Sequence, residues 1–382
     1  AELQKMLDIT YDIACRYHIE FGKEKSKAMK IGGGKTNQPE FRLGDMILEY
    51  TDKYKYLGEI LYNKNNMTDH ISATKGKVEA AYQTILTITG NSTFKEIEMQ
   101  VVWELVECCI TAIITYGAET WYTTKTEMDK LNKLMDNIIK RILMVPQSKP
   151  REALYMETGL LDPETIAMKN RIMLHHRLAT GPPRRSAKLA QTQEKKSWGE
   201  TTAATMILAD ISDTDLEGKK NTAKRKVSNK IKAMFKKAIE EKSKNKSKVN
   251  HLKEGNINWK PQVRQKYMET LTRDQVSLIF KAKSRMLDIK NNFRNKYTNL
   301  ECRACGKVIE TQSHVLEMCE VIHKNDGKYK IPHHELFQSN PQKLKEVAKR
   351  LKYIMTIIQC NSLTDQVQLA QSRTGAPLQT EE

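Results

Sequence analysis

The sequence predicts a mainly α-helical protein with a small α+β portion at its N-terminus and a small zinc knuckle further along the chain. Leu, Ile and Met recur at helical spacing through most of the 382 residues. Short alternating segments, typical of strands, occur only before residue 66. Three cysteines and a histidine lie at metal-ligand spacing within residues 302–319. The longest apolar run, residues 101–116, contains two glutamates, so we expect no membrane-spanning helix and no membrane partner.

The α+β portion is expected over residues 1–66. Residues 1–18 carry apolar side chains on one helical face and predict an amphipathic helix. Short strands are expected on both sides of a basic turn at residues 22–27. Gly44 and Asp45 separate two apolar triplets and predict a hairpin. A further strand is expected over residues 54–61.

Residues 67–180 predict a helical domain. Four helices are expected, over residues 68–89, 92–116, 124–143 and 163–178. Thr68 and Ser92 are suitable N-caps, and Pro163 suits the first turn of the last helix.

The rest of the chain divides by composition into four parts. These are a polar linker (181–223), a basic helical segment (224–300), the zinc knuckle (301–325), and a C-terminal helix with a disordered tail (326–382). Only one weak helix is expected in the linker, at residues 203–211. Basic helices are expected over 224–241 and 272–290, and the last helix over 341–359, with disorder from Ser362.

Basic residues are concentrated in one segment. Lys and Arg number 64 against 46 acidic residues, a net charge of +18. The stretch from Lys219 to Lys296 contains 24 of the cations and six acids, and so holds the whole excess. A single basic run is often a solvated helix face, but this concentration favours RNA or DNA as a partner. The cations expected at phosphates are Lys224, Arg225, Lys226, Lys230, Lys232, Lys281, Lys283, Arg285, Lys290, Arg294, Lys296 and Arg303.

The cysteines indicate a metal site. Their number, seven, is odd, which favours a reducing, intracellular compartment, and we expect the nucleus and cytoplasm. The metal ligands are predicted to be Cys302, Cys305, His314 and Cys319, spaced C-x2-C-x8-H-x4-C. Four such ligands suit a structural Zn²⁺, because they leave no open position for water. Buried thiols without metal are the alternative, and His323 is a substitute ligand.

Three segments resemble the reverse transcriptases of non-LTR (LINE-type) retrotransposons. Residues 3–29 are similar to the helix, strand and basic turn that follow the family's catalytic Asp-Asp turn. Tyr54-Lys-Tyr-Leu-Gly-Glu-Ile60 resembles the primer-grip hairpin, and Ile113-Ile-Thr-Tyr-Gly-Ala-Glu-Thr-Trp121 resembles the thumb. Several such proteins carry a similar cysteine finger at the place of the knuckle. The resemblance implies the end of a palm over 1–66 and a helical thumb over 67–180.

The resemblance also implies roles for individual residues. Lys25 matches a cation near the leaving pyrophosphate, with Lys23 and Lys27 as rivals and a solvent-facing turn as the alternative. Tyr56, Leu57 and Gly58 match the primer grip, although residues of a strand core would look the same.

The catalytic carboxylates are missing from this sequence. The family's Mg²⁺ ions are held by a strand Asp and an Asp-Asp turn, which would lie upstream of Ala1. The chain contains no Asp-Asp pair, and two-metal polymerisation needs such carboxylates. We therefore expect Mg²⁺ only in a parent polymerase, and no polymerisation by this chain alone.

The resulting functional expectation is a nucleic-acid-binding C-terminal part of an RNA-directed DNA polymerase. It would grip template RNA and the primer–template duplex, RNA–DNA or DNA, for target-primed reverse transcription, beside an upstream palm and fingers. Bases would stack near the knuckle, where the candidates are Phe293, Arg294, Tyr297 and Arg303. The alternatives are a domesticated, non-enzymatic zinc-dependent RNA-binding protein and a zinc-stapled protein-interaction module.

Overall fold

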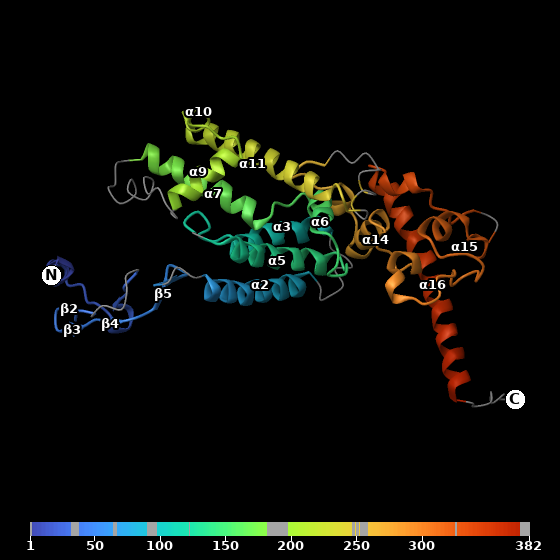
Figure 1. The fold of residues 1–382 in the computed structure, drawn as a ribbon, viewed down its shortest axis with the longest axis horizontal. Coiled ribbons are helices and arrows are strands. Elements are labelled where there is room, and N and C mark those ends of the chain that lie inside the picture. Colours follow the sequence, from blue (N-terminus) through green and yellow to red (C-terminus); the bar gives the residue numbers. More distant parts are fainter. Residues whose placement is uncertain are drawn as a thin grey trace. The chain divides into compact units, whose positions relative to one another are not determined.

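The computed structural model is mainly helical, with a small strand-containing portion at the N-terminus, as the sequence predicts (Figure 1). The structure describes residues 2–31, 38–63, 67–89, 98–121, 123–181, 198–246, 249, 252, 259–324 and 327–374, with side chains as far as Cys360. The chain forms two compact units. The first contains residues 1–76 and 121–130, and the second contains residues 77–120 and 131–382.

The first unit opens with helix α1 (Glu2–Arg16), as expected, followed by the 3-10 turn Lys23–Lys25. Strand β1 (Lys27–Ala28) pairs in parallel with β4 (Glu49–Tyr50). The strand expected at residues 19–21 is absent from the described structure, where this segment is irregular. Only Ala14 of α1 is buried, so the apolar face that the sequence predicts for this helix remains exposed.

The predicted hairpin is present as β2 (Arg42–Leu43) and β3 (Met46–Ile47). Gly44 has φ +61°, and a Cβ at this position would lie 2.3 Å from the ring of Tyr11 on α1. Only glycine meets both conditions, because the positive φ disfavours side chains and α1 leaves no room for one.

Residues 54–61, expected as one strand from their pattern and as a hairpin from the resemblance, form a second hairpin. Strands β5 (Lys53–Tyr56) and β6 (Glu59–Tyr62) pair in antiparallel fashion around Leu57 and Gly58. These two residues have φ of +48° and +89°, as in the turns that match the twist of a hairpin. The Trp121 indole N–H donates to the Glu59 carboxylate (3.1 Å) and so anchors β6.

The predicted helices of residues 67–180 are present, with one addition and one interruption. They are α2 (Thr68–Ile88), α3 (Met99–Leu105), the π-helical turn Val106–Thr111, α4 (Ala112–Ile114), α5 (Lys125–Ile142), α6 (Arg151–Thr158) and α7 (Pro163–Thr180). The predicted cap Ser92 lies outside the described residues. Pro163 begins α7, and the Asp162 side chain accepts from the Thr165 N–H as its N-cap.

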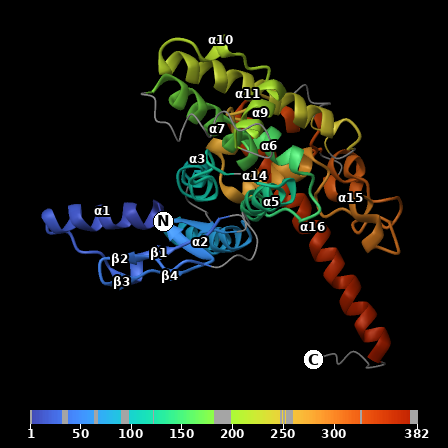
Figure 2. The ribbon, with the colours of Figure 1, turned by 60° about the vertical axis from the view of Figure 1, so that its left-hand side comes forward.

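The linker predicted at 181–223 is folded over its described part, which is a correction. Helices α9 (Trp198–Leu208) and α10 (Asp213–Leu216) pack against α7 and α11 (Lys220–Ser243). All four lie side by side in Figures 1 and 2. The apolar residues around them form one core: Ile172, Ala209, Ile211, Leu216, Val227 and Ile231. Burial of these side chains, which composition alone did not reveal, orders the segment.

Helix α11 is the predicted basic amphipathic helix. Every fourth residue is buried, namely Ala223, Val227, Ile231, Phe235, Ile239 and Ser243. Phe235 meets the ring of Tyr155 on α6 edge to face, with centroids 5.8 Å apart. The i, i+4 spacing places all six on one stripe and leaves the cations on the other faces.

The C-terminal third corrects two boundaries. The helix expected at 272–290 is only α14 (Arg273–Lys283), after the short α13 (Tyr267–Thr270) and before a 3-10 segment, Lys290–Lys296. Helix α16 (Pro341–Thr374) packs on α14 and continues beyond Ser362, where disorder was expected (Figure 2).

Candidate zinc centre and cationic groove

The structure brings the four predicted zinc ligands together. One ligand atom from each of Cys302, Cys305, His314 and Cys319 lies within 4.8 Å of the others. The Cys302 and Cys319 Sγ atoms are 4.0 Å apart, and Cys305 Sγ is 3.4 Å from His314 Nε2. These separations, and a donor set of three sulfur atoms and one nitrogen, fit tetrahedral Zn²⁺ with no open position, a structural site. The cluster can therefore hold a metal ion.

Local backbone geometry explains why these four residues converge. The Gly306 N–H donates to the Cys302 carbonyl (2.8 Å), closing the tight turn that carries the first two cysteines. Gly306 has φ +66°, a conformation that glycine adopts without strain. The π-helical turn His314–Met318 carries the histidine, and the Cys319 N–H donates to the His314 carbonyl (2.8 Å).

Burial disfavours the charged thiolate form of two of the four predicted ligands. Burial raises the pKa of Cys302 to about 12 and raises that of Cys319. Burial opposes ionisation of Cys305 as well, but backbone N–H groups, first that of Lys307, lower its pKa overall. Burial lowers the pKa of His314, which favours the neutral imidazole that binds metal. Zn²⁺ would supply the charge that stabilises the buried thiolates.

Arg303 is part of the knuckle core, which corrects its assignment to nucleic acid and to base stacking. Its side chain is 5% exposed and pairs with the fully buried Glu310 (2.7 Å). Glu310 also accepts from the backbone N–H groups of Arg303 and Lys290. The Arg303 charge is thus used to neutralise a buried carboxylate.

Lys283 is likewise corrected from a phosphate contact to a core residue. Its side chain is 4% exposed, and its ammonium lies 2.8 Å from Glu157 on α6, which also accepts from the Tyr267 hydroxyl (2.6 Å). Burial lowers the pKa of Lys281, which is half-buried. Lys283 therefore offers no free cation at the surface of α14.

The other predicted cations of this region remain at the surface to different degrees. Arg285, Arg294 and Lys296 are exposed, whereas Lys290 is half-buried and donates to the Glu301 carbonyl (2.9 Å). Lys296 lies over the ring of Phe293, 5.0 Å from its centroid. The Tyr297 hydroxyl donates to Asp288 (2.9 Å), so this ring is held in place.

On α11 the predicted cations fall into two groups. Lys224 and Arg225 are exposed and form no ion pair with any described residue. Lys226 donates to the Thr214 carbonyl (3.3 Å), and Lys230 pairs with Asp215 (2.7 Å), which joins α11 to α10. Lys232 is half-buried.

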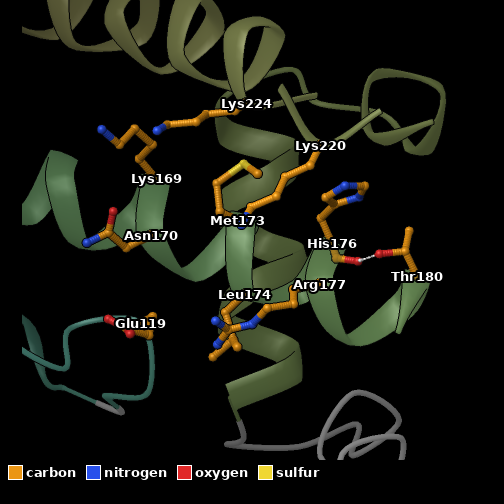
Figure 3. A pocket seen from close by; sticks show the side chains of 10 residues that line it. All are labelled: Glu119, Lys169, Asn170, Met173, Leu174, His176, Arg177, Thr180, Lys220 and Lys224. Atoms are coloured by element: carbon orange, nitrogen blue, oxygen red, sulfur yellow. Dashed lines mark hydrogen bonds between the residues drawn. The ribbon is translucent and has the colours of Figure 1, made fainter. Parts of the chain in front are cut away.

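A groove lies beside the first group, lined by residues of α7 and α11 (Figure 3). Its volume is about 380 Å³, and its cations are Lys169, Arg177, Lys220 and Lys224, against one acid, Glu119. Burial lowers the pKa of Lys169, and the charges of Lys224 and Lys232 lower it further. Sequence reasoning missed Lys169 and Arg177, because they lie outside the basic segment and reach it only through helix packing.

The residues matched to the palm are exposed. Tyr56 and Leu57 are 57% and 73% exposed at the tip of the β5–β6 hairpin, so they are not residues of a strand core. Lys25 is also exposed, and its carbonyl accepts from the Tyr54 hydroxyl (2.7 Å), which joins the basic turn to β5. Lys27 pairs with Glu49 and is therefore already neutralised.

Comparisons with known proteins identify no relative: no family model, curated protein or solved structure matches this chain. Among the helices that the structure describes, none combines the length and the apolar character needed to cross a membrane.

Proposed function

We propose that this chain is the nucleic-acid-binding C-terminal part of a LINE-type reverse transcriptase, gripping template RNA and the primer–template duplex. The observation that carries the proposal is the groove of α7 and α11. Its lysines and arginine outnumber the single acid. Burial lowers the pKa of Lys169 most, and repulsion from Lys224 and Lys232 lowers it further. A phosphate backbone would relieve that repulsion without any reading of sequence.

Two other features support the parent class. The exposed Tyr56–Gly58 tip is accessible to a primer end, and Lys25 lies on the turn joined to the same hairpin. Helix α1 exposes Leu3, Met6 and Ile9, each by about half or more. Apolar side chains gathered on one helical face favour a protein partner, which in this proposal is the palm and fingers. Zn²⁺ would hold the knuckle fold.

The test is RNA binding by the whole chain at several salt concentrations. Lys169, Lys224 and Arg225 are replaced together by Gln. If each cation meets one phosphate, the log–log salt slope on single strands should flatten by about 2, and affinity should fall alike for all sequences.

The matched control replaces Lys236, Lys244 and Lys349 by Gln. It removes the same charge from cations that already pair with Glu240, Glu241 and Glu346, so the slope should hardly change. A slope and affinity identical to the parent's in the Lys169, Lys224 and Arg225 variant would refute the proposal and favour a zinc-stapled protein-interaction module. Coding sequence for an Asp-Asp turn upstream of Ala1 would favour the polymerase over a domesticated RNA-binding protein.

A further inference from the structure

A second cavity, of about 460 Å³, adjoins the zinc centre. Its walls come from the residues after α14, the 3-10 segment Lys290–Lys296, and the π-helical turn that carries His314. The volume lies in the range of sites for small ligands. None of the predicted zinc ligands lines it, so it is separate from the metal site.

Three side-chain amides line this cavity, and each has one atom fixed by a hydrogen bond inside the protein. Asn291 Oδ1 accepts from Arg294 Nε (2.8 Å). Asn292 Nδ2 donates to the Leu287 carbonyl (3.0 Å), and Gln312 Nε2 donates to the Ala282 carbonyl (2.8 Å). These bonds hold the amides in place before any ligand arrives.

The other atom of each amide has no hydrogen-bond partner among the described residues. One is a donor, Asn291 Nδ2, and two are acceptors, Asn292 Oδ1 and Gln312 Oε1. Gln312 is only 8% exposed. Its unpaired Oε1 therefore costs folding free energy unless a ligand donates a hydrogen bond to it. The pattern is one donor beside two acceptors.

Two charged residues also line the cavity. Glu317 adds a further acceptor, and Arg285 adds a guanidinium, neither of them ion-paired within the described parts of the chain. Arg285 has φ +49°, a strained conformation for a non-glycine residue and one that concentrates at functional sites. Leu316 supplies an apolar wall. The hydroxyls of Thr311 and Ser313 and the ring of His333 also line the cavity and can donate or accept. The groups of fixed polarity are the amide atoms, the Glu317 carboxylate and the Arg285 guanidinium, and among them acceptors outnumber amide donors.

We propose that this cavity binds one unpaired guanine base. The Watson–Crick edge of guanine offers one acceptor, O6, next to two donors, N1–H and the 2-amino group, whereas adenine, cytosine and uracil each offer a single donor group there. Asn291 would donate to O6, the oxygens of Asn292, Gln312 and Glu317 would accept from the two donors, and Arg285 would meet the adjoining phosphate.

The inference deepens the proposed function and rests on it for the source of the base, a guanine within single-stranded RNA rather than a free nucleotide. The experiment uses the zinc-loaded full chain and a labelled uridine oligonucleotide with one central guanine. Oligonucleotides with central adenine or inosine, and GMP alone, are the comparison ligands. We expect guanine to bind about tenfold more tightly than adenine, with inosine, which lacks the 2-amino group, in between.

Two variants locate the preference. Asn291→Leu and Glu317→Gln should each bring the guanine-to-adenine ratio close to one, with zinc content unchanged. The matched controls Asn295→Leu and Glu320→Gln, exposed neighbours outside the cavity, should keep the preference. Equal affinity for guanine and adenine, or a preference that survives both cavity variants, would overturn the inference.

The experiment distinguishes failure of the guanine site from failure of the proposed function. Salt-dependent RNA binding without guanine preference would overturn the guanine site and leave the groove standing. Binding of GMP in preference to AMP by a chain that does not bind RNA would support the guanine site while the proposed function fails.

Discussion

The α7–α11 helices and the α14–knuckle region are both rich in Lys and Arg, but two cations of the first and two of the second have opposite environments. On the first, Lys224 and Arg225 point to solvent without an acidic partner among the described residues. In the second, Lys283 and Arg303 are at most 5% exposed and pair with the fully buried Glu157 and Glu310. The same residue type is therefore left exposed at Lys224 and Arg225, and neutralises a buried carboxylate at Lys283 and Arg303.

The largest effect is expected on removing zinc. Cys305→Ser, or chelation, should abolish the one bound Zn²⁺ and unfold residues of about 300–322, because site binding energy, on the order of 10 kcal/mol, is largely folding energy. The α7–α11 helices should persist, since none of their contacts involves the ligands. Elemental analysis measures the zinc content, and hydrogen exchange measures local unfolding in the knuckle and in the α7–α11 helices separately. Cys108→Ser, at an exposed cysteine outside the cluster, is the control; unchanged zinc in Cys305→Ser would contradict the site.

The next effect concerns the buried lysine. Lys283→Met leaves Glu157 buried without its cation, and this should lower the free energy of unfolding by about 3–5 kcal/mol. Lys224→Met replaces an exposed lysine of α11. It should change the free energy of unfolding by no more than about 0.5 kcal/mol. Urea unfolding measures both, and adding Glu157→Gln to Lys283→Met should recover part of the loss. A variant at Lys283 that lost RNA affinity at full stability would break the comparison.

The smallest effect is a pH dependence in the α7–α11 region. His175 on α7 lies against the Trp198 ring, 6.3 Å between centroids. Burial lowers its pKa, His176 lowers it further and Asp213 opposes this. The unfolded chain therefore takes up the proton at a higher pH than the folded one, so stability should fall as pH drops below about 6.5. The free energies of unfolding of the parent and of His175→Gln, measured with urea, should converge at acid pH. If both fall in parallel as pH drops, His175 is not the cause of the pH dependence.

The parts of the fold that could be predicted from sequence are those with a clear period or turn signal. Helices α2, α5, α7 and α11 and the β2–β3 hairpin fall where the pattern places them. Helix α6 was not predicted, because every residue after Arg151 is buried, Glu152 and Glu157 included, and a helix buried all round shows no amphipathic period.

The candidate zinc site could be predicted for a different reason. Its ligands are close in sequence and chemically unambiguous, so spacing alone suffices. The cationic groove needed the structure, because Lys169 meets Lys224 only when α7 packs on α11. The roles of Lys283 and Arg303 needed it too, since a lysine or arginine in a basic run carries no sign of the buried acid that it will meet.

One hydrogen bond of the fold has a consequence for folding during synthesis of the chain on the ribosome. The indole N–H of the fully buried Trp103 on α3 donates to the carbonyl of Met268 on α13 (3.0 Å), 165 residues further along the chain. At roughly 5–20 residues per second, a ribosome needs roughly 10–30 s to synthesise the residues from Trp103 to Met268. Met99, Val102 and Trp103 have no exposed surface in the finished fold. The packing of α13 on α3 cannot form until that time has passed. We therefore expect this face of α3 to stay uncovered by α13 in the nascent chain until the C-terminal third begins to emerge.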